Sequence, residues 1–269
     1  MPSNNSLLLR LTRYSHYEEQ FTRAKNLVED ILAHQAPEGL QVLSTDESYY
    51  TDHGVGHIQR VISKLEALDA LLRIPVNEKE AFILLVAAYF HDIGMFLGRR
   101  EGEDAETARR EHHRRGADII QKLNDEHYLD IDSPELSIIK KVIEAHRVID
   151  LKELPESQMI EGIKIRTRLL GALLRIADSC DCDRSRAPKA IFDLFYESIP
   201  ENSKEYWRIH FPITDVTFED RRASIAISIN FAGEPNEKIE KYRIANLLKK
   251  SLRKSCEALK QYSGIILFH

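Results

Sequence analysis

The sequence lacks the features of a secreted, membrane-spanning or disulfide-bonded protein. Its longest uninterrupted apolar run, residues 81–90, is about half of the roughly 20 residues that a helix needs to cross a bilayer. The cysteines are few, Cys180, Cys182 and Cys256, and the close pair is not spaced like the usual zinc-binding pair. No signal-peptide pattern opens the chain, because Arg10 directly follows a short apolar stretch. We therefore expect a cytoplasmic protein that has no membrane partner.

An excess of positive charge is also missing. The formal net charge is −5, so no overall basic field attracts nucleic acid, and we expect no binding to a duplex. No internal repeat or low-complexity tract interrupts the 269 residues. A chain of this length, with 43% hydrophobic and 30% charged residues, can bury one large core or two smaller ones.

The apolar run at residues 81–90 is the segment around which we expect the fold to be organised. Because it is apolar on every side, it predicts a helix that is buried all round. Asn77, with Glu80 three residues later, predicts a capping box at its start. His91 and Asp92 follow the run directly, and burying such ionisable side chains is costly unless something binds them.

Helical periodicity predicts further helices on both sides of this segment, over residues 16–34, 52–74, 105–126, 133–148 and 163–178. Asp52 is the expected cap of the second of these helices. Pro134 is the expected first-turn proline of the fourth. Residues 35–51 and 150–161 are predicted to be loop and linker, and residues 1–14 a strand or docking arm.

The pattern changes after about residue 200. Residues 207–213 and 225–231 alternate between apolar and polar side chains, which predicts a β-hairpin with one apolar face. Pro212 requires its strand to be an edge strand or to contain a bulge. Residues 235–262 have the spacing of a long amphipathic helix.

These elements predict a mainly α fold with a C-terminal β-hairpin and long helix. We expect a helical domain over residues 1–200 and an appendage, formed by the hairpin and helix, over residues 201–269. Since every predicted helix has an apolar stripe, the helices are expected to share a core.

Five of the predicted helices each carry a side chain, or a His-Asp pair, that can bind metal. The candidates are His57, His91, Asp92, His112 or His113, His146 and Asp178. Helical bundles build metal sites from inward-facing imidazoles and carboxylates on different helices. This mixture of ligands suits Mn, Fe, Zn or Mg. Asp92 is the natural bridge if two ions bind, because a carboxylate has two oxygens.

The order of these residues resembles the HD superfamily of metal-dependent phosphohydrolases. The resemblance is carried by GHIQRV, FHDIG, HHRRG, EAHR and RIADSCD, between residues 56 and 181. It implies an HD-domain helical bundle. It implies that one metal ion is bound by His57, His91, Asp92 and Asp178, and that a second site is completed by His112 and His146. His112 is preferred over His113 because it stands four residues before Gly116, as in similar sequences.

The segment TDHGVGH is similar to the His-x-x-x-His segment of cyclic-nucleotide phosphodiesterases. That similarity implies that His53 donates a proton to the leaving oxygen, and its position one turn before His57 agrees. The chain departs from the subfamily that hydrolyses cyclic dinucleotides, because Met95 replaces its lysine and a Gly-Tyr-Pro motif is absent. The sequence is most similar to the HD-CE group, whose members are sometimes joined to an ATPase of the heat-shock chaperone type.

We therefore expect a metal-dependent phosphohydrolase that cleaves a phosphoester bond in a nucleotide by metal-activated water, with one or two divalent ions. Arg147 and Arg115 are the expected phosphate-binding residues, and Arg109, Arg184 and Arg186 are also in range. The alternatives are a metal-dependent single-strand nuclease, a non-enzymatic nucleotide-sensing module and an iron-dependent oxygenase. A homo-oligomer or a fused or partner ATPase is compatible with the sequence.

Some polar residues near the expected site are assigned structural roles. We expect Asp181 and Asp183 to cap a turn or to pair with Arg184. His210 stands apart from the candidate ligands in the sequence and is expected to be structural or exposed.

Overall fold

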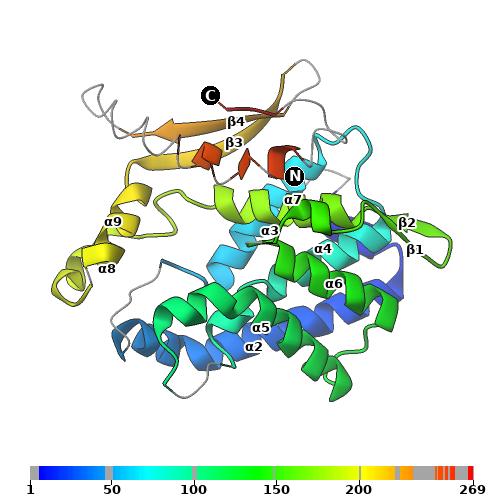
Figure 1. Ribbon diagram of the computed structural model, residues 1–269, viewed down its shortest axis with the longest axis horizontal. Coiled ribbons are helices and arrows are strands. Elements are labelled where there is room, and N and C mark those ends of the chain that lie inside the picture. The colour runs from blue at the N-terminus through cyan, green and yellow to red at the C-terminus, as the bar shows by residue number, and fades with distance from the viewer. Residues whose placement is uncertain are drawn as a thin grey trace.

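In the computed structural model the protein is a bundle of helices with a small β-sheet at one end (Figure 1). The structure describes residues 6–45, 51–98, 102–147, 149–199, 201–221, 225–232, 246, 248–250, 252–253, 255–257 and 266–268. For residues 35–45, 105, 202 and 266–268 it describes the backbone alone. No helix within these ranges is long and apolar enough to cross a membrane.

The mainly α prediction is confirmed. The α-helices are α1 (Leu7–Leu11), α2 (Ser15–Thr45), α3 (Val55–Asp69), α4 (Glu78–Phe90), α5 (Ala105–Asp125), α6 (Ser133–Ala145), α7 (Thr167–Cys180), α8 (Lys189–Leu194) and α9 (Glu201–His210). Short 3₁₀ turns are η1 (Ile93–Met95), η2 (Leu151–Glu153) and η3 (Tyr196–Ser198). Strands β1 (Gln158–Ile160) and β2 (Ile163–Ile165) pair antiparallel. A separate sheet has the order β3 (Ile213–Asp220), β4 (Ile225–Phe231) and β5 (Ile266–Phe268), with β5 parallel to β4.

Helix α4 is the centre of the bundle, as its apolar sequence predicts. Every residue from Lys79 to Phe90 is buried, and α4 contacts α1, α2, α3, α5, α6 and α7. The predicted capping box is present, since Asn77 and Glu80 exchange side-chain to backbone hydrogen bonds. The Glu80 carboxylate also accepts hydrogen bonds from Arg166, which joins the start of α4 to the start of α7. The end of α4, where His91 and Asp92 lie, is thereby fixed inside the molecule.

A close contact between η1 and α5 follows directly after α4. A Cβ atom on Gly94 would lie 2.2 Å from the His112 carbonyl oxygen and 2.9 Å from the Gly116 amide nitrogen. A Cβ atom on Gly116 would lie 3.0 Å from the Phe90 carbonyl oxygen. Glycine at both positions therefore lets α5 approach η1 closely enough to bring His112 beside Asp92.

Two predictions for the N-terminal part of the chain are wrong. Helix α2 runs to Thr45 and does not give way to a loop at residue 35. Pro37 removes only one backbone donor, and a helix that is already formed over many residues can extend past it. The segment assigned to a strand or docking arm instead contains α1, which begins where the Ser6 hydroxyl accepts a hydrogen bond from the Leu9 amide.

The helix predicted from residue 163 begins later, at Thr167. Residues 158–165 form the β1–β2 hairpin instead of the end of a linker and the start of a helix. Its two turn residues, Glu161 and Gly162, have φ values of 49° and 79°. Positive φ at both positions is the signature of the tight turn that suits a hairpin. Helix α3 likewise begins two residues later than predicted, with Gly54 and not Asp52 at its N-cap position.

The predicted strand over residues 225–231 is confirmed, but the strand predicted over residues 207–213 is wrong. Residues 201–210 form helix α9, and the strand partner of β4 is β3. The alternating pattern that suggested a strand also fits a helix, because Trp207 and Phe211 are four residues apart and can lie on one helical face. Both pack on Phe192 of α8, in a small cluster separate from the main core. β3 is an edge strand with a register shift after Ile213, as Pro212 predicts.

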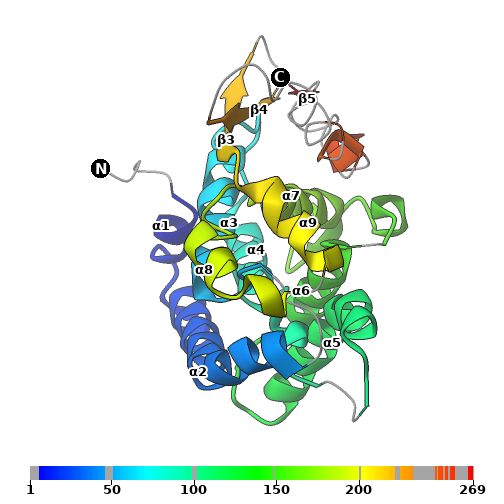
Figure 2. The same ribbon diagram turned by 90° about the vertical axis from the view of Figure 1, so that its left-hand side faces the viewer.

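The sheet packs on the bundle at one end (Figures 1 and 2). Side chains of both hairpin strands, including Val216 and Ile227, belong to the same buried cluster as the helices. Residues 246, 248–250, 252–253 and 255–257 are helical, and the rest of the long helix predicted over residues 235–262 lies outside the described residues. The division into two domains at residue 200 stays a prediction.

We predict that Gly94→Ala lowers the free energy of unfolding by about 1–3 kcal/mol, because its Cβ would meet backbone atoms that cannot move independently. Gly56→Ala is the control, since a Cβ there would meet only the side chains of Asp52 and Arg60. Alanine also favours a helix over glycine by about 1 kcal/mol. Denaturant unfolding of both variants measures the difference. Equal stability of the two variants would contradict the proposed close contact.

Candidate metal centre

The structure brings the six predicted ligands together in two groups that share one carboxylate. His57 comes from α3, His91 and Asp92 from the end of α4, and Asp178 from α7. One ligand atom from each of these four lies within 4.8 Å of the others. The second group has the same compactness and contains Asp92, His112 of α5 and His146 at the end of α6.

Each imidazole of the centre has its Nδ1 directed at an oxygen. The His91 Nδ1 lies 2.8 Å from the carbonyl oxygen three residues earlier. The corresponding distances are 2.5 Å for His112 and 2.5 Å for His146. A carbonyl oxygen can only accept, so each Nδ1 carries the proton and each Nε2 carries a lone pair.

The Nδ1 atom of His57 contacts a carboxylate oxygen, where the other three histidines contact a backbone carbonyl oxygen. This nitrogen lies 2.7 Å from an Asp181 oxygen. Burial raises the pKa of Asp181, but hydrogen bonds from His57 and Arg60 outweigh burial and lower it to about 2. Arg186 also lies 3.0 Å from the His57 Nδ1, but an ionised carboxylate at 2.7 Å is the contact that requires a proton on that nitrogen.

The Nε2 atoms of these imidazoles face one another. The Nε2 atoms of His57 and His91 are 3.1 Å apart, and those of His112 and His146 are 2.9 Å apart. Asp92 lies between the two pairs. Its Oδ2 is 3.4 Å from His57 Nε2 and 3.2 Å from His91 Nε2, and its Oδ1 is 3.1 Å from His112 Nε2 and 3.6 Å from His146 Nε2. Each oxygen of the Asp92 carboxylate therefore lies next to a different pair of imidazoles.

The charges of the centre favour bound cations. Burial raises the pKa of Asp92, but the surrounding histidines outweigh it and hold the pKa well below its usual value. The pKa of Asp178 is likewise lowered, because contacts with His57 and Arg186 outweigh burial. Burial lowers the pKa of His146 to about 3, so this imidazole stays neutral and keeps its lone pair. Two carboxylates are therefore ionised beside it.

The pKa of His57 also shows that this centre favours positive charge. Burial and Arg186 act to lower its pKa, yet contacts with three carboxylates raise it to about 10. Those carboxylates stabilise positive charge at this point, whether a proton or a metal ion carries it. A proton can be shared by only one pair of nitrogens, whereas a divalent ion accepts lone pairs from two imidazoles and a carboxylate together. The donor set therefore fits a divalent metal ion with mixed nitrogen and oxygen ligands.

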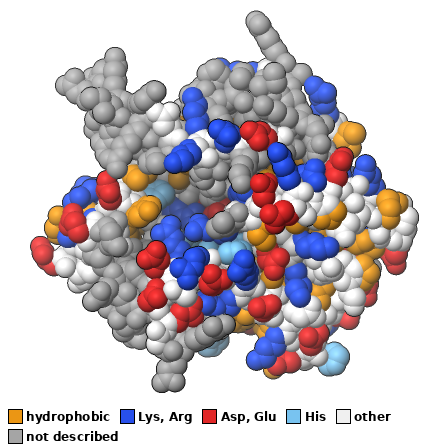
Figure 3. Space-filling model, in the orientation of Figure 1, with side chains coloured by type: hydrophobic (Ala, Val, Ile, Leu, Met, Phe, Trp, Pro, Cys, Tyr) orange, Lys and Arg blue, Asp and Glu red, His pale blue; other side chains and the backbone are white. Residues whose placement is uncertain are grey.

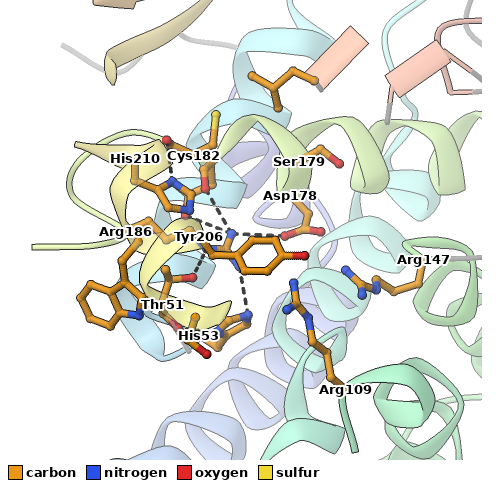
Figure 4. Close-up of a pocket in the computed structure, with 14 residues that line it drawn as sticks. Thr51, His53, Arg109, Arg147, Asp178, Ser179, Cys182, Arg186, Tyr206 and His210 are labelled. Atoms are coloured by element: carbon orange, nitrogen blue, oxygen red, sulfur yellow. Dashed lines mark hydrogen bonds and ion pairs between the residues drawn. The ribbon is translucent and has the colours of Figure 1, made fainter. Parts of the chain in front are cut away.

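A pocket opens beside the first group of ligands. Asp178 lies at its wall, and Arg109, Arg147 and Arg186 contribute guanidinium groups. In Figure 4, Arg109 and Arg147 point toward the space in front of Asp178. Lysine and arginine side chains gather around a hollow near the middle of the face in Figure 3, with histidine beside them. The pocket thus combines a carboxylate wall with a cationic wall.

Of the two arginines predicted to bind phosphate, the structure places only Arg147 in the pocket. Arg115 donates a hydrogen bond to the Gly94 carbonyl oxygen at 2.9 Å and forms an ion pair with Glu103. These contacts hold its guanidinium against the segment after α4. Phosphate binding by Arg115 stays a prediction, and it requires these contacts to break. Arg184, which was also in range, is exposed and does not line the pocket.

His53 lies in the pocket but is not set up as a proton donor. Its Nδ1 contacts the Thr51 carbonyl oxygen, and its Nε2 lies 3.1 Å from Arg186, which donates to it. Burial and the Arg186 charge lower the pKa of His53 well below its usual value. Proton donation from His53 stays a prediction, and it requires the Arg186 contact to break.

Three residues near the site have roles that the sequence did not reveal. Asp181 orients His57 and accepts hydrogen bonds from Arg60, where we expected a turn cap or a pair with Arg184. Arg186 contacts Asp178 at 3.4 Å and His53 at 3.1 Å. His210 lines the pocket. The sequence did contain one indication of the role of Asp181. It lies three residues after the candidate ligand Asp178, so both residues lie at the end of α7, which contacts α3.

A helical bundle whose central helix ends in His-Asp, with further histidines and an aspartate converging on that pair, defines the HD-superfamily class of domain. The chain belongs to the HD-CE family, whose family model matches residues 47–258. A search of curated proteins found no significant match. The resemblance to HD domains is confirmed, and membership of this class indicates a metal-dependent hydrolase.

We predict that Asp181→Asn weakens binding of a divalent ion by about 10–100-fold, because it removes the charge that orients and polarises His57. Asp183→Asn is the matched control, since Asp183 accepts hydrogen bonds from Ser185 and not from a candidate ligand. Titration of Mn²⁺ or Zn²⁺ against a chromophoric chelator measures the affinity. If both variants bind as tightly as the wild type, Asp181 does not support the site.

Proposed function

We propose that this protein hydrolyses a phosphoester bond in a nucleotide, using divalent ions held by His57, His91, Asp92, His112, His146 and Asp178. The observation that supports this most is the placement of two facing imidazole pairs on the two oxygens of Asp92, beside a pocket that contains arginines. Divalent ions held by these residues would lower the pKa of a bound water and polarise a phosphoryl oxygen.

The protein's own residues orient the substrate from the pocket side. A phosphate in front of Asp178 would lie within the space toward which Arg147 and Arg109 point (Figure 4). Guanidinium groups bind phosphate through paired, charge-assisted hydrogen bonds. They also stabilise the negative charge that grows on the phosphoryl oxygens as the bond breaks.

Arg186 has a different task from the other two arginines. Its guanidinium is buried and contacts Asp178, Asp181 and His53. It therefore neutralises part of the carboxylate charge behind the ligands and holds the side of the pocket in place. Phosphate binding is assigned to Arg147 and Arg109, which come from the end of α6 and from α5.

We predict that Asp92→Ala reduces nucleotide turnover at least about 100-fold, because it removes the carboxylate shared by both groups of ligands. A panel of nucleoside mono-, di- and triphosphates and cyclic nucleotides, assayed with Mn²⁺, measures phosphate or nucleotide release. Asp118→Ala, an exposed aspartate on α5, is the control and keeps full activity.

Assays on the same purified protein distinguish hydrolysis of a nucleotide from the nuclease and sensing alternatives. Cutting of a labelled single-stranded oligonucleotide without turnover of the panel favours a nuclease. Tight nucleotide binding without turnover favours a sensing module. Turnover that is unchanged in Asp92→Ala contradicts a role for this centre in hydrolysis.

A further inference from the structure

We propose that α9 is the helix that recognises the nucleoside part of the substrate, and that the base stacks on the ring of Tyr206. This inference rests on the proposed function, because it concerns the portion of the substrate beyond the phosphoester. It assigns specificity to a segment that lies outside the helices carrying the candidate metal ligands.

One face of α9 forms a wall of the pocket. Four of its side chains line the pocket at positions i, i+3, i+4 and i+7 of the helix, namely Ser203, Tyr206, Trp207 and His210. Asp178 and Asp181, at the end of α7, also line it. A substrate whose phosphate lies in front of Asp178 therefore has α9 as a neighbour for its remaining atoms (Figure 4).

Tyr206 presents an aromatic ring at this wall. The residue is 57% exposed, and the Arg109 guanidinium carbon lies 5.2 Å from its ring centroid. A cation in this position attracts the ring and holds it in place. In Figure 4 the ring extends from α9 toward the space between Asp178 and Arg109. An exposed ring held next to phosphate-binding arginines is a stacking surface for a planar base.

The orientation of α9 is fixed by the neighbour of Tyr206. Trp207 is only 4% exposed, and its ring centroid lies 6.0 Å from that of Phe192 on α8. Phe211 packs on the same Phe192 ring at 5.1 Å. Since adjacent residues on a helix point about 100° apart, burying Trp207 in this cluster sets the direction in which Tyr206 points.

His210 adds a hydrogen-bond acceptor to the same wall. Its Nδ1 lies 2.7 Å from the Cys182 carbonyl oxygen and donates to it. Burial lowers the pKa of His210 to about 4, so the ring is neutral and its Nε2 can accept a hydrogen bond. An aromatic ring, an imidazole acceptor and the Ser203 hydroxyl match a base and the hydroxyl groups of a sugar. A phosphoester without a base would leave the Tyr206 ring unused.

The test is equilibrium binding by calorimetry to the full chain loaded with Mn²⁺. The probes are 5′-phosphonate analogues of the four ribonucleosides, which cannot be hydrolysed at the ester position, and the corresponding phosphonate of ribose alone. We expect at least one nucleoside analogue to bind about tenfold more tightly than the ribose analogue. Tyr206→Leu should abolish this preference, and Tyr206→Phe, which keeps the ring, should retain it.

Glu205→Gln is the matched control, because Glu205 is exposed on α9 and does not line the pocket, and it should bind both kinds of probe like the wild type. The inference is overturned if no nucleoside analogue binds, if the base adds no affinity, or if the preference survives in Tyr206→Leu. Base-dependent binding without turnover of any nucleotide would contradict the proposed hydrolysis and leave nucleoside recognition by α9 standing.

Discussion

The contact of two imidazole pairs with the two oxygens of Asp92 is the interaction on which the rest of this site depends. Each of the four Nδ1 atoms is engaged with a carbonyl or carboxylate oxygen, so the Nε2 atoms meet in pairs 3.1 and 2.9 Å apart. Three carboxylates raise the pKa of His57 to about 10, so positive charge beside the first pair of nitrogens is stabilised, whether a proton or a metal ion carries it. Asp92 offers one oxygen to each pair, so its carboxylate could be shared by ions bound at the two groups of ligands.

The bundle holds this arrangement through the ends of its helices. His91 and His146 each follow the last residue of a helix, and each directs its Nδ1 at a carbonyl of the preceding turn. Carbonyls in the last turn lack the usual partner four residues later, so the same contact supplies a donor at the helix end and orients the ligand. The glycine contact between η1 and α5 then sets the distance between Asp92 and His112. Burial of α4 on all sides explains why a charged pair can stand at its end.

The sequence predicted the helices of the bundle because their apolar stripes and caps are local signals. It also indicated that His57, His91 and Asp92 converge, since helices that share a core bring their inward side chains together. The partition of the ligands into two groups came from family resemblance, not from spacing. Local patterns could not predict that Asp181 contacts His57, which is 124 residues away, or that Arg115 pairs with Glu103. The alternation from Trp207 to Phe211 fits a strand and a helix equally well. The helix forms because both side chains pack on Phe192 of α8.

Anomalous diffraction from crystals of the protein grown with Mn²⁺ or Zn²⁺ tests the proposed metal centre most directly. We expect anomalous peaks on both sides of Asp92, one within ligand distance of the Nε2 atoms of His57 and His91 and one within ligand distance of those of His112 and His146. Ions bound only at other places, or facing imidazole pairs that remain free of metal at saturating concentration, would contradict it.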